Sequence, residues 1–153
     1  MNELPDLKAT VHRACLQVLD ERIAAAQASI ADTQAASQSD TKSSAGDKHE
    51  TARAMAQLEL EKQTSVLQHL QRMHAQVERL APSDERTQVG PGVLVRTDSG
   101  WFYIAVPLGR IVVGGEEVWA ISTEAPIYAA LKSTPVGQVA FYSGKAYRIL
   151  EVR

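Results

Sequence analysis

The first half of the sequence is poor in residues that interrupt helices, and it has no Phe, Trp or Tyr. Gly46 is the single glycine among the first 89 residues, and no proline occurs between Pro5 and Pro82. All eight aromatic residues lie after residue 100. Because glycine and proline are the strongest helix breakers, their scarcity allows two long helices before residue 81. The contrast predicts two differently built halves.

Other shortages exclude whole classes of protein. Cys15 is the single cysteine, so no internal disulfide is expected. No segment approaches the ~18 apolar residues of a membrane span, and the N-terminus lacks the layout of a signal peptide. We therefore expect a cytoplasmic protein with no membrane partner. The net charge of −2 argues against a general nucleic-acid-binding surface, and we expect no independent sequence-specific DNA binding.

Two long helices are predicted, over residues 5–37 and about 47–80. In the first, one apolar row has the 3-4-3-4 spacing of a helix contact: Leu16, Leu19, Ile23, Ala26 and Ile30. In the second, the row is spaced 4-3-4-3: Val66, Leu70, Met73, Val77 and Leu80. The polar stretch 37–46 between them predicts a loop. Helices of equal length joined by a short loop form an antiparallel pair of about 50 Å.

The segment after the first Gly, at 47–50, carries two acids at the start of the second helix. Asp47 and Glu50 are three residues apart and share a helix face, so together they can reach a single metal ion. The same Asp-x-x-Glu pattern is a capping box, in which both acids satisfy N–H groups of the helix start. The two interpretations are compatible. Alone on an exposed tip, the pair would bind no metal stably.

The second half predicts a small, mostly antiparallel sheet after a linker at 82–89. Six strands are expected, over 93–96, 101–106, 111–113, 118–121, 139–142 and 147–152. Gly114-Gly115 and Ser143-Gly144 suit tight hairpins. A short helix is expected over 126–131, with Pro126 in its first turn. The fold class is therefore α+β.

Gly46-Asp47-Lys-His-Glu50-Thr-Ala is similar to the Gly-Asp-x-x-Glu-Asn-Ala motif at the coiled-coil tip of the bacterial Gre family of transcript cleavage factors. Ile121-Ser-Thr-Glu-Ala-Pro126 and Leu131 resemble its Ile-Ser-x-x-Ser-Pro-x-x-x-x-Leu stretch. The closing segment 147–152 resembles its last strand. Thr51 and Ala125 depart from the family's Asn and Ser.

The resemblance implies an antiparallel coiled coil at 1–81 with its tip near 38–50, followed by an FKBP-like domain at 90–153. It implies binding to bacterial RNA polymerase, with the coiled coil in the secondary channel. There Asp47 and Glu50 would assist the polymerase's second magnesium, and the polymerase would cleave its own backtracked RNA. The chain would not be an enzyme itself and would bind no cofactor alone. Ala125, Pro126 and Ile127 would lie near the docking surface.

Several alternatives remain open on the sequence alone. Lys42, Lys48 and Arg53 surround the tip and either contact RNA phosphates or form an ordinary solvated surface. A Gre-like regulator that blocks the channel without stimulating cleavage fits the departures from the family pattern. A prolyl isomerase and a dimerising coiled-coil adaptor are two further possibilities.

Overall fold

The computed structural model describes residues 6–41, 47–82 and 84–153. The chain divides into two compact units. The hairpin unit is Val18–His74, and the sheet unit combines Met1–Gln17 with Ala75–Arg153. Within the described residues, no helix has the length and apolarity that a membrane span requires.

The two long helices predicted from the sequence are present, as α1 (Leu7–Thr41) and α2 (Asp47–Glu78). The predicted end of α1 at residue 37 was wrong, because the helix continues through 38–41. Polar residues cost only a few tenths of a kcal/mol each in a helix, so a helix already formed continues through them. α2 ends at Glu78, two residues before the predicted end at Leu80, and Pro82 prevents any long continuation.

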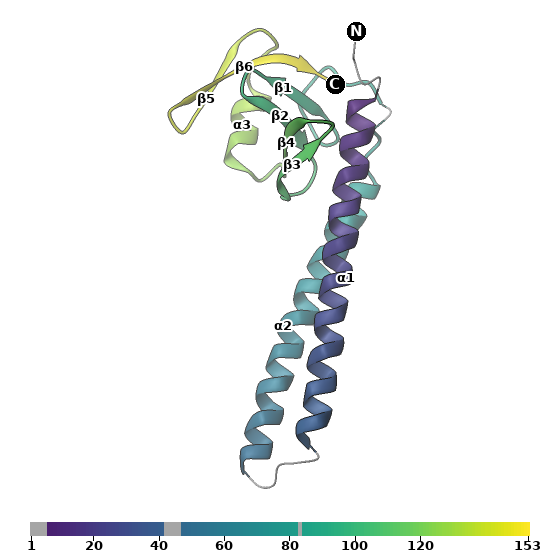
Figure 1. The fold of residues 1–153 in the computed structure, drawn as a ribbon. Helices are drawn as coiled ribbons and strands as arrows, with labels where there is room; N and C mark the ends of the chain where they lie inside the picture. Colours follow the sequence, from purple (N-terminus) through teal and green to yellow (C-terminus); the bar gives the residue numbers. More distant parts are fainter. Residues whose placement is uncertain (1–5, 42–46, 83) are drawn as a thin grey trace. The chain divides into compact units, whose positions relative to one another are not determined.

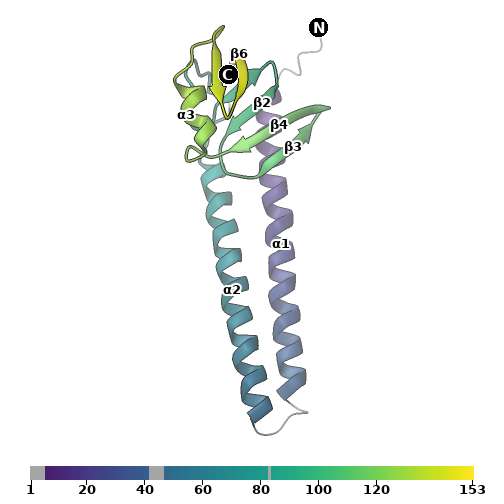
Figure 2. The same ribbon diagram turned by 90° about the vertical axis from the view of Figure 1, so that its left-hand side faces the viewer.

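In the hairpin unit, α1 and α2 run side by side and antiparallel (Figure 1, Figure 2). Two polar contacts fix this direction, Gln63 to Ser29 and Thr33, and His74 to Asp20. The predicted row on α1 is confirmed, since all five of its residues are buried or half-buried.

The predicted row on α2 was wrong at Val66, whose side chain is 49% exposed. The buried and half-buried row instead has the 4-3-4-3 spacing of Ala56, Leu60, Gln63, Leu67 and Leu70. A row through Val66 continues toward the helix start to the charged Glu59, whereas a row through Leu67 continues to Leu60. Burying two leucines is favoured over burying a valine and a carboxylate.

The sheet has six strands in the order β3-β4-β2-β1-β6-β5. Their bounds lie within two residues of the predicted ones: β1 (Leu94–Thr97), β2 (Gly100–Ile104), β3 (Gly109–Val113), β4 (Glu116–Ile121), β5 (Val139–Tyr142) and β6 (Lys145–Val152). All neighbouring pairs are antiparallel except β2 with β4, which are parallel. The sheet is therefore mixed, and the α+β class is confirmed.

Both predicted tight hairpins are present. Gly114 and Gly115 join β3 to β4, and Ser143 and Gly144 join β5 to β6; all four residues have positive φ. Two successive residues of positive φ define the turn whose twist matches that of paired strands. Ser143, with φ 52, is the one non-glycine residue of positive φ among those described.

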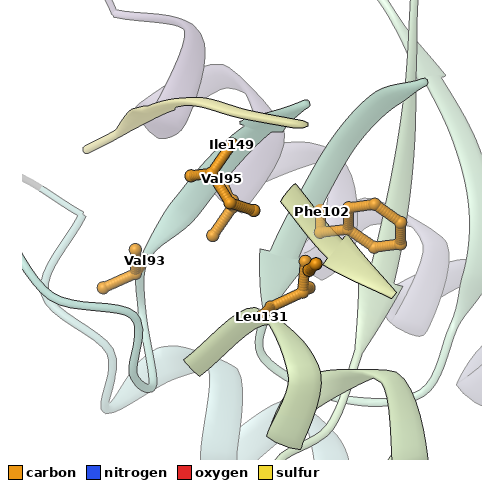
Figure 3. Close-up of a cluster of buried hydrophobic side chains, with 6 residues drawn as sticks. Val93, Val95, Phe102, Leu131 and Ile149 are labelled. Carbon is orange, nitrogen blue, oxygen red and sulfur yellow. The ribbon is translucent and has the colours of Figure 1, made fainter. Parts of the chain in front are cut away.

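One face of the sheet packs on α3 (Pro126–Lys132), where the predicted short helix lies. Figure 3 shows the shared core, built from Val93, Val95 of β1, Phe102 of β2, Leu131 of α3 and Ile149 of β6. Strand alternation places Leu94, Trp101, Tyr103 and Val118 on the opposite face. There Tyr103 contacts His12, near the start of α1.

Candidate functional site

The first candidate site is the start of α2. The helix begins at Asp47, as predicted, and Glu50 lies three residues later with an exposed side chain. Acidic residues are favoured here, because the first N–H groups of a helix lack partners and carry partial positive charge. Lys42 lies outside the described residues, as does the side chain of Asp47. The capping interpretation of Asp47 therefore stays a prediction.

Glu50 points away from the contact between the two helices. At 100° per residue, it lies roughly 110° around α2 from the row that packs on α1. Lys48 and Arg53 are also exposed, while His49 is half-buried. Arg53 follows Glu50 by three residues, so the two are neighbours on the helix surface. The site is thus a solvent-accessible carboxylate with one cationic neighbour, Arg53, on the same helix surface.

This arrangement suits shared rather than independent metal binding. The described residues contain no group of three or more His, Cys, Asp or Glu side chains that could hold a metal. Magnesium usually takes one or two protein carboxylates and keeps several waters or substrate oxygens. Glu50, with Asp47 at the preceding position on this face, offers only a partial ligand set, which another macromolecule must complete.

In the part of the chain that the structure describes, neither histidine of the second half of α2 belongs to a group that could hold a metal. His69 is exposed. The Nε2 atom of His74 lies 3.0 Å from Oδ1 of Asp20, across the helix pair. His74 therefore has a role in holding α1 to α2.

The second candidate surface is the start of α3. Ala125 is the N-cap residue, with φ −63 and ψ 132, and it provides no side-chain cap. The preceding turn is held by Ser122, whose carbonyl accepts from the N–H of Ala125 at 3.1 Å. Oγ of Ser122 also accepts from the N–H of Glu124 at 3.2 Å. The turn keeps its shape without a hydroxyl at 125.

The three residues of this surface differ in accessibility. Pro126 is exposed, whereas Ala125 and Ile127 are half-buried. Ile127 packs against the core cluster of the sheet unit. Pro126 is therefore the member most available to a partner. The starts of α2 and α3 belong to different compact units and form two surfaces.

A buried polar pair in the sheet unit was not predicted from the sequence. Nδ1 of His12 lies 2.8 Å from the hydroxyl of Tyr103, with the rings edge to face at 6.2 Å. His12 is 7% exposed and Tyr103 is fully buried. Burial lowers the pKa of His12 and raises that of Tyr103, since it disfavours the charged form of each. The available signal was the 4-3 spacing of Lys8, His12 and Cys15, which places the three residues on one helix face.

A hollow of about 530 Å³ lies between the start of α1, the linker and the end of the chain. Its charged lining residues carry both signs: Asp6, Lys8, Asp84, Glu85, Arg86, Glu151 and Arg153. Nζ of Lys8 donates to the carbonyl of Asp84 at 2.5 Å, and burial, with Arg86 nearby, lowers the pKa of Lys8. No aromatic side chain among the described residues lines this hollow, so it does not resemble an apolar site for a proline peptide.

Comparisons with protein-family models, with curated proteins and with solved structures each find no match for this chain. Its function must therefore be inferred from its own residues.

Proposed function

We propose that the chain is a Gre-like accessory factor of bacterial RNA polymerase. Its helical hairpin, as a coiled coil, enters the secondary channel and presents Asp47 and Glu50 to the polymerase's active centre. There the polymerase cleaves the backtracked 3′ end of its own RNA. The C-terminal part acts as an FKBP-like docking domain, with Pro126 as its exposed contact and Ala125 and Ile127 beside it.

The observation that carries this proposal is the exposure of Glu50 in the first turn of α2, at the hairpin's turn end. An exposed acid at the end of a two-helix hairpin is in reach of a partner. The motif resemblance around Asp47 and around Pro126 supplies the identity of that partner.

The chain's chemical contribution would be positioning. Carboxylate oxygens of Asp47 and Glu50 would complete the ligand set of the second magnesium ion, which the polymerase holds loosely. In two-metal sites the pair of ions would together stabilise the attacking and leaving oxygens, and Asp47 and Glu50 would help to hold one of the two. Lys48 and Arg53 would face RNA phosphates beside the acids.

The test is RNA cleavage in a stalled, backtracked elongation complex. We expect shortened RNA with the wild-type chain and at least a tenfold lower cleavage rate with Glu50→Ala or Asp47→Ala. Asp32→Ala removes an exposed acid from α1, away from the start of α2, and should leave the rate unchanged. Equal cleavage by all four proteins would refute the proposal.

A second candidate is a channel-binding regulator that does not stimulate cleavage. Two observations favour it: Arg53 lies beside Glu50 on the helix surface, and α3 lacks a side-chain cap at Ala125. In this case the chain binds polymerase and inhibits RNA synthesis, with no shortened RNA. Polymerase binding measured alongside the cleavage assay separates the two functions.

A further inference from the structure

The outer side of α2 carries apolar side chains that the hairpin unit leaves uncovered. Met55 is 62% exposed, Leu58 is 59% exposed and Val66 is 49% exposed. They belong to one unit and one helix, within three turns of one another. An isolated exposed leucine is ordinary, but three large apolar side chains on one side of a helix indicate a contact surface.

These residues form part of a second row on α2. Met55, Glu59, Lys62 and Val66 are spaced 4-3-4, the spacing of a helix–helix contact. At 100° per residue, the four lie within roughly 60° of one another, and Leu58 borders them. The row that packs on α1 lies roughly 90° further around the helix. α2 thus has one row that α1 covers and a second row that is exposed.

The exposed row is complementary to itself when reversed. Met55 pairs with Val66, and Glu59 pairs with Lys62, around one common midpoint between residues 60 and 61. A two-fold axis at this midpoint would place Met55 of each copy against Val66 of the other. It would likewise place Glu59 of each copy against Lys62 of the other. Isologous contacts require this self-complementarity. In a parallel arrangement, by contrast, Glu59 would face Glu59 and Lys62 would face Lys62.

The row also borders a shallow cleft. The cleft has a volume of about 110 Å³ and is lined by Ala26, Ser29, Glu59, Lys62, Gln63 and Val66. Under the two-fold arrangement, Glu59 of the second copy would lie over this cleft, next to Lys62. The concave part of the surface would thus receive a side chain of the opposite charge.

We propose that this row, Met55–Glu59–Lys62–Val66, is a self-association surface through which two copies pair their α2 helices antiparallel. The occupant is a second copy of this chain, since the charge order matches itself. The contact is small, about 16 Å along the helix. It falls well below the 1,200–2,000 Å² of a stable interface, so the dissociation constant should be on the order of 10–100 µM. The inference uses only side chains of the hairpin unit and does not depend on the proposed function.

Sedimentation velocity over a concentration series tests the association with the full chain. We expect a monomer at about 1 µM and a growing dimer fraction above about 20 µM. Val66→Glu places a carboxylate against Met55 of the second copy and should weaken association at least tenfold. Thr64→Glu is the matched control, because Thr64 is exposed on the opposite side of α2. A monomer at every concentration, or equal weakening by both variants, would overturn the proposal.

Charge reversal tests the pairing itself. Glu59→Lys and Lys62→Glu each bring like charges together across the axis and should weaken the dimer. The double variant restores both opposite-charge pairs and should recover wild-type association. Circular dichroism verifies that each protein remains helical. If the double variant associates no better than the single ones, the assigned pairing is wrong.

Cross-linking tests the direction of the pair. Under oxidation, the double variant Met55→Cys with Val66→Cys should give a covalent dimer, because each cysteine faces its counterpart. Neither single variant should cross-link, since the two copies of each residue lie about 16 Å apart along the axis. Cys15 does not interfere, because it is buried. A cross-linked dimer of the Met55→Cys single variant would show parallel pairing and contradict the inference.

Discussion

The contact between His12 and Tyr103 shows what one buried polar pair does to a small protein. His12 can hydrogen-bond the tyrosine hydroxyl without a charge, so both groups are satisfied while both stay neutral. Burial of His12 costs free energy when its imidazole takes up a proton, because the charged form is then buried. Burial lowers the pKa of His12, with Lys8 and Cys15 one turn away on its own helix.

Stability should therefore fall in mild acid. As the pH drops below about 6.5, the unfolded chain takes up a proton on His12 before the folded chain does. The free energy of unfolding should then decrease by at most about 1.4 kcal/mol per pH unit from this residue. The measurement is urea unfolding at several pH values between 5 and 8. His12→Gln keeps a hydrogen-bonding side chain and should show a shallower slope; an unchanged slope would contradict the assignment.

Cys15 should be chemically inert in the folded protein. Its side chain is fully buried, and burial raises the pKa of its thiol to about 12. The reactive thiolate is then a trace species at pH 8. With a thiol-specific chromogenic reagent, we expect reaction within minutes in denaturant and little reaction over an hour without it. Rapid labelling of the native chain would show that this part of α1 opens readily.

At the scale of a single element, the buried row of α2 is the side of the helix that packs on α1. Its buried row contains one polar residue, Gln63. Nε2 of Gln63 donates to Oγ of Ser29 at 3.0 Å and to Oγ1 of Thr33 at 2.9 Å. Its Oε1 is buried without a hydrogen-bond partner among the described residues. A polar residue in such a row fixes how two helices align, at a cost in stability.

Replacing Gln63 by leucine should therefore stabilise the hairpin. Gln63→Leu removes an unsatisfied acceptor and extends the apolar row, so the free energy of unfolding should rise by about 1 kcal/mol. Gln68→Leu changes an exposed glutamine on the same helix and should alter it by less than about 0.5 kcal/mol. Chemical unfolding followed by circular dichroism compares the two. If the Gln63→Leu variant is less stable than the wild type, the hydrogen bonds of Gln63 contribute more to stability than its buried, unpaired Oε1 costs.

Two neighbouring residues of α2 distinguish the buried row from the exposed one. Leu67→Ala should lower the free energy of unfolding by about 1–3 kcal/mol, because Leu67 faces α1. Val66→Ala should lower it by less than about 1 kcal/mol, because Val66 is half exposed. Measurements at about 1 µM avoid any contribution from self-association. The reverse order of effects would restore the row first expected from the sequence.

At the scale of the whole molecule, the proposed self-association and the proposed polymerase binding together give one prediction. A hairpin paired with a second copy is no longer a single two-helix rod, so pairing should keep it out of the polymerase channel. Cleavage per molecule should then decline as the wild-type concentration passes the dissociation constant. Val66→Glu should show no such decline, while Thr64→Glu should behave as the wild type. If both variants show the decline, the loss of cleavage activity does not come from self-association.

Much of this molecule follows from local signals in the sequence. The scarcity of glycine and proline before residue 81 determined two long helices, and Gly114-Gly115 and Ser143-Gly144 determined two hairpins. Such signals act within a few residues, so no distant partner is needed to interpret them. The start of α2 at Asp47 belongs to this group. The roles given to Asp47, Glu50 and the residues around Pro126 remain predictions, because nothing in the folded chain alone tests them.

Other features were decided only when distant segments met. The sequence predicted a row on α2 through Val66 and Leu70, and packing against α1 selected Leu67 over Val66. Likewise, β4 pairs parallel to β2 although β3 precedes it, and His12 meets Tyr103 from 91 residues away. Each outcome depends on the free energy of burying one set of side chains instead of another. That difference exists only between segments that the fold has brought together.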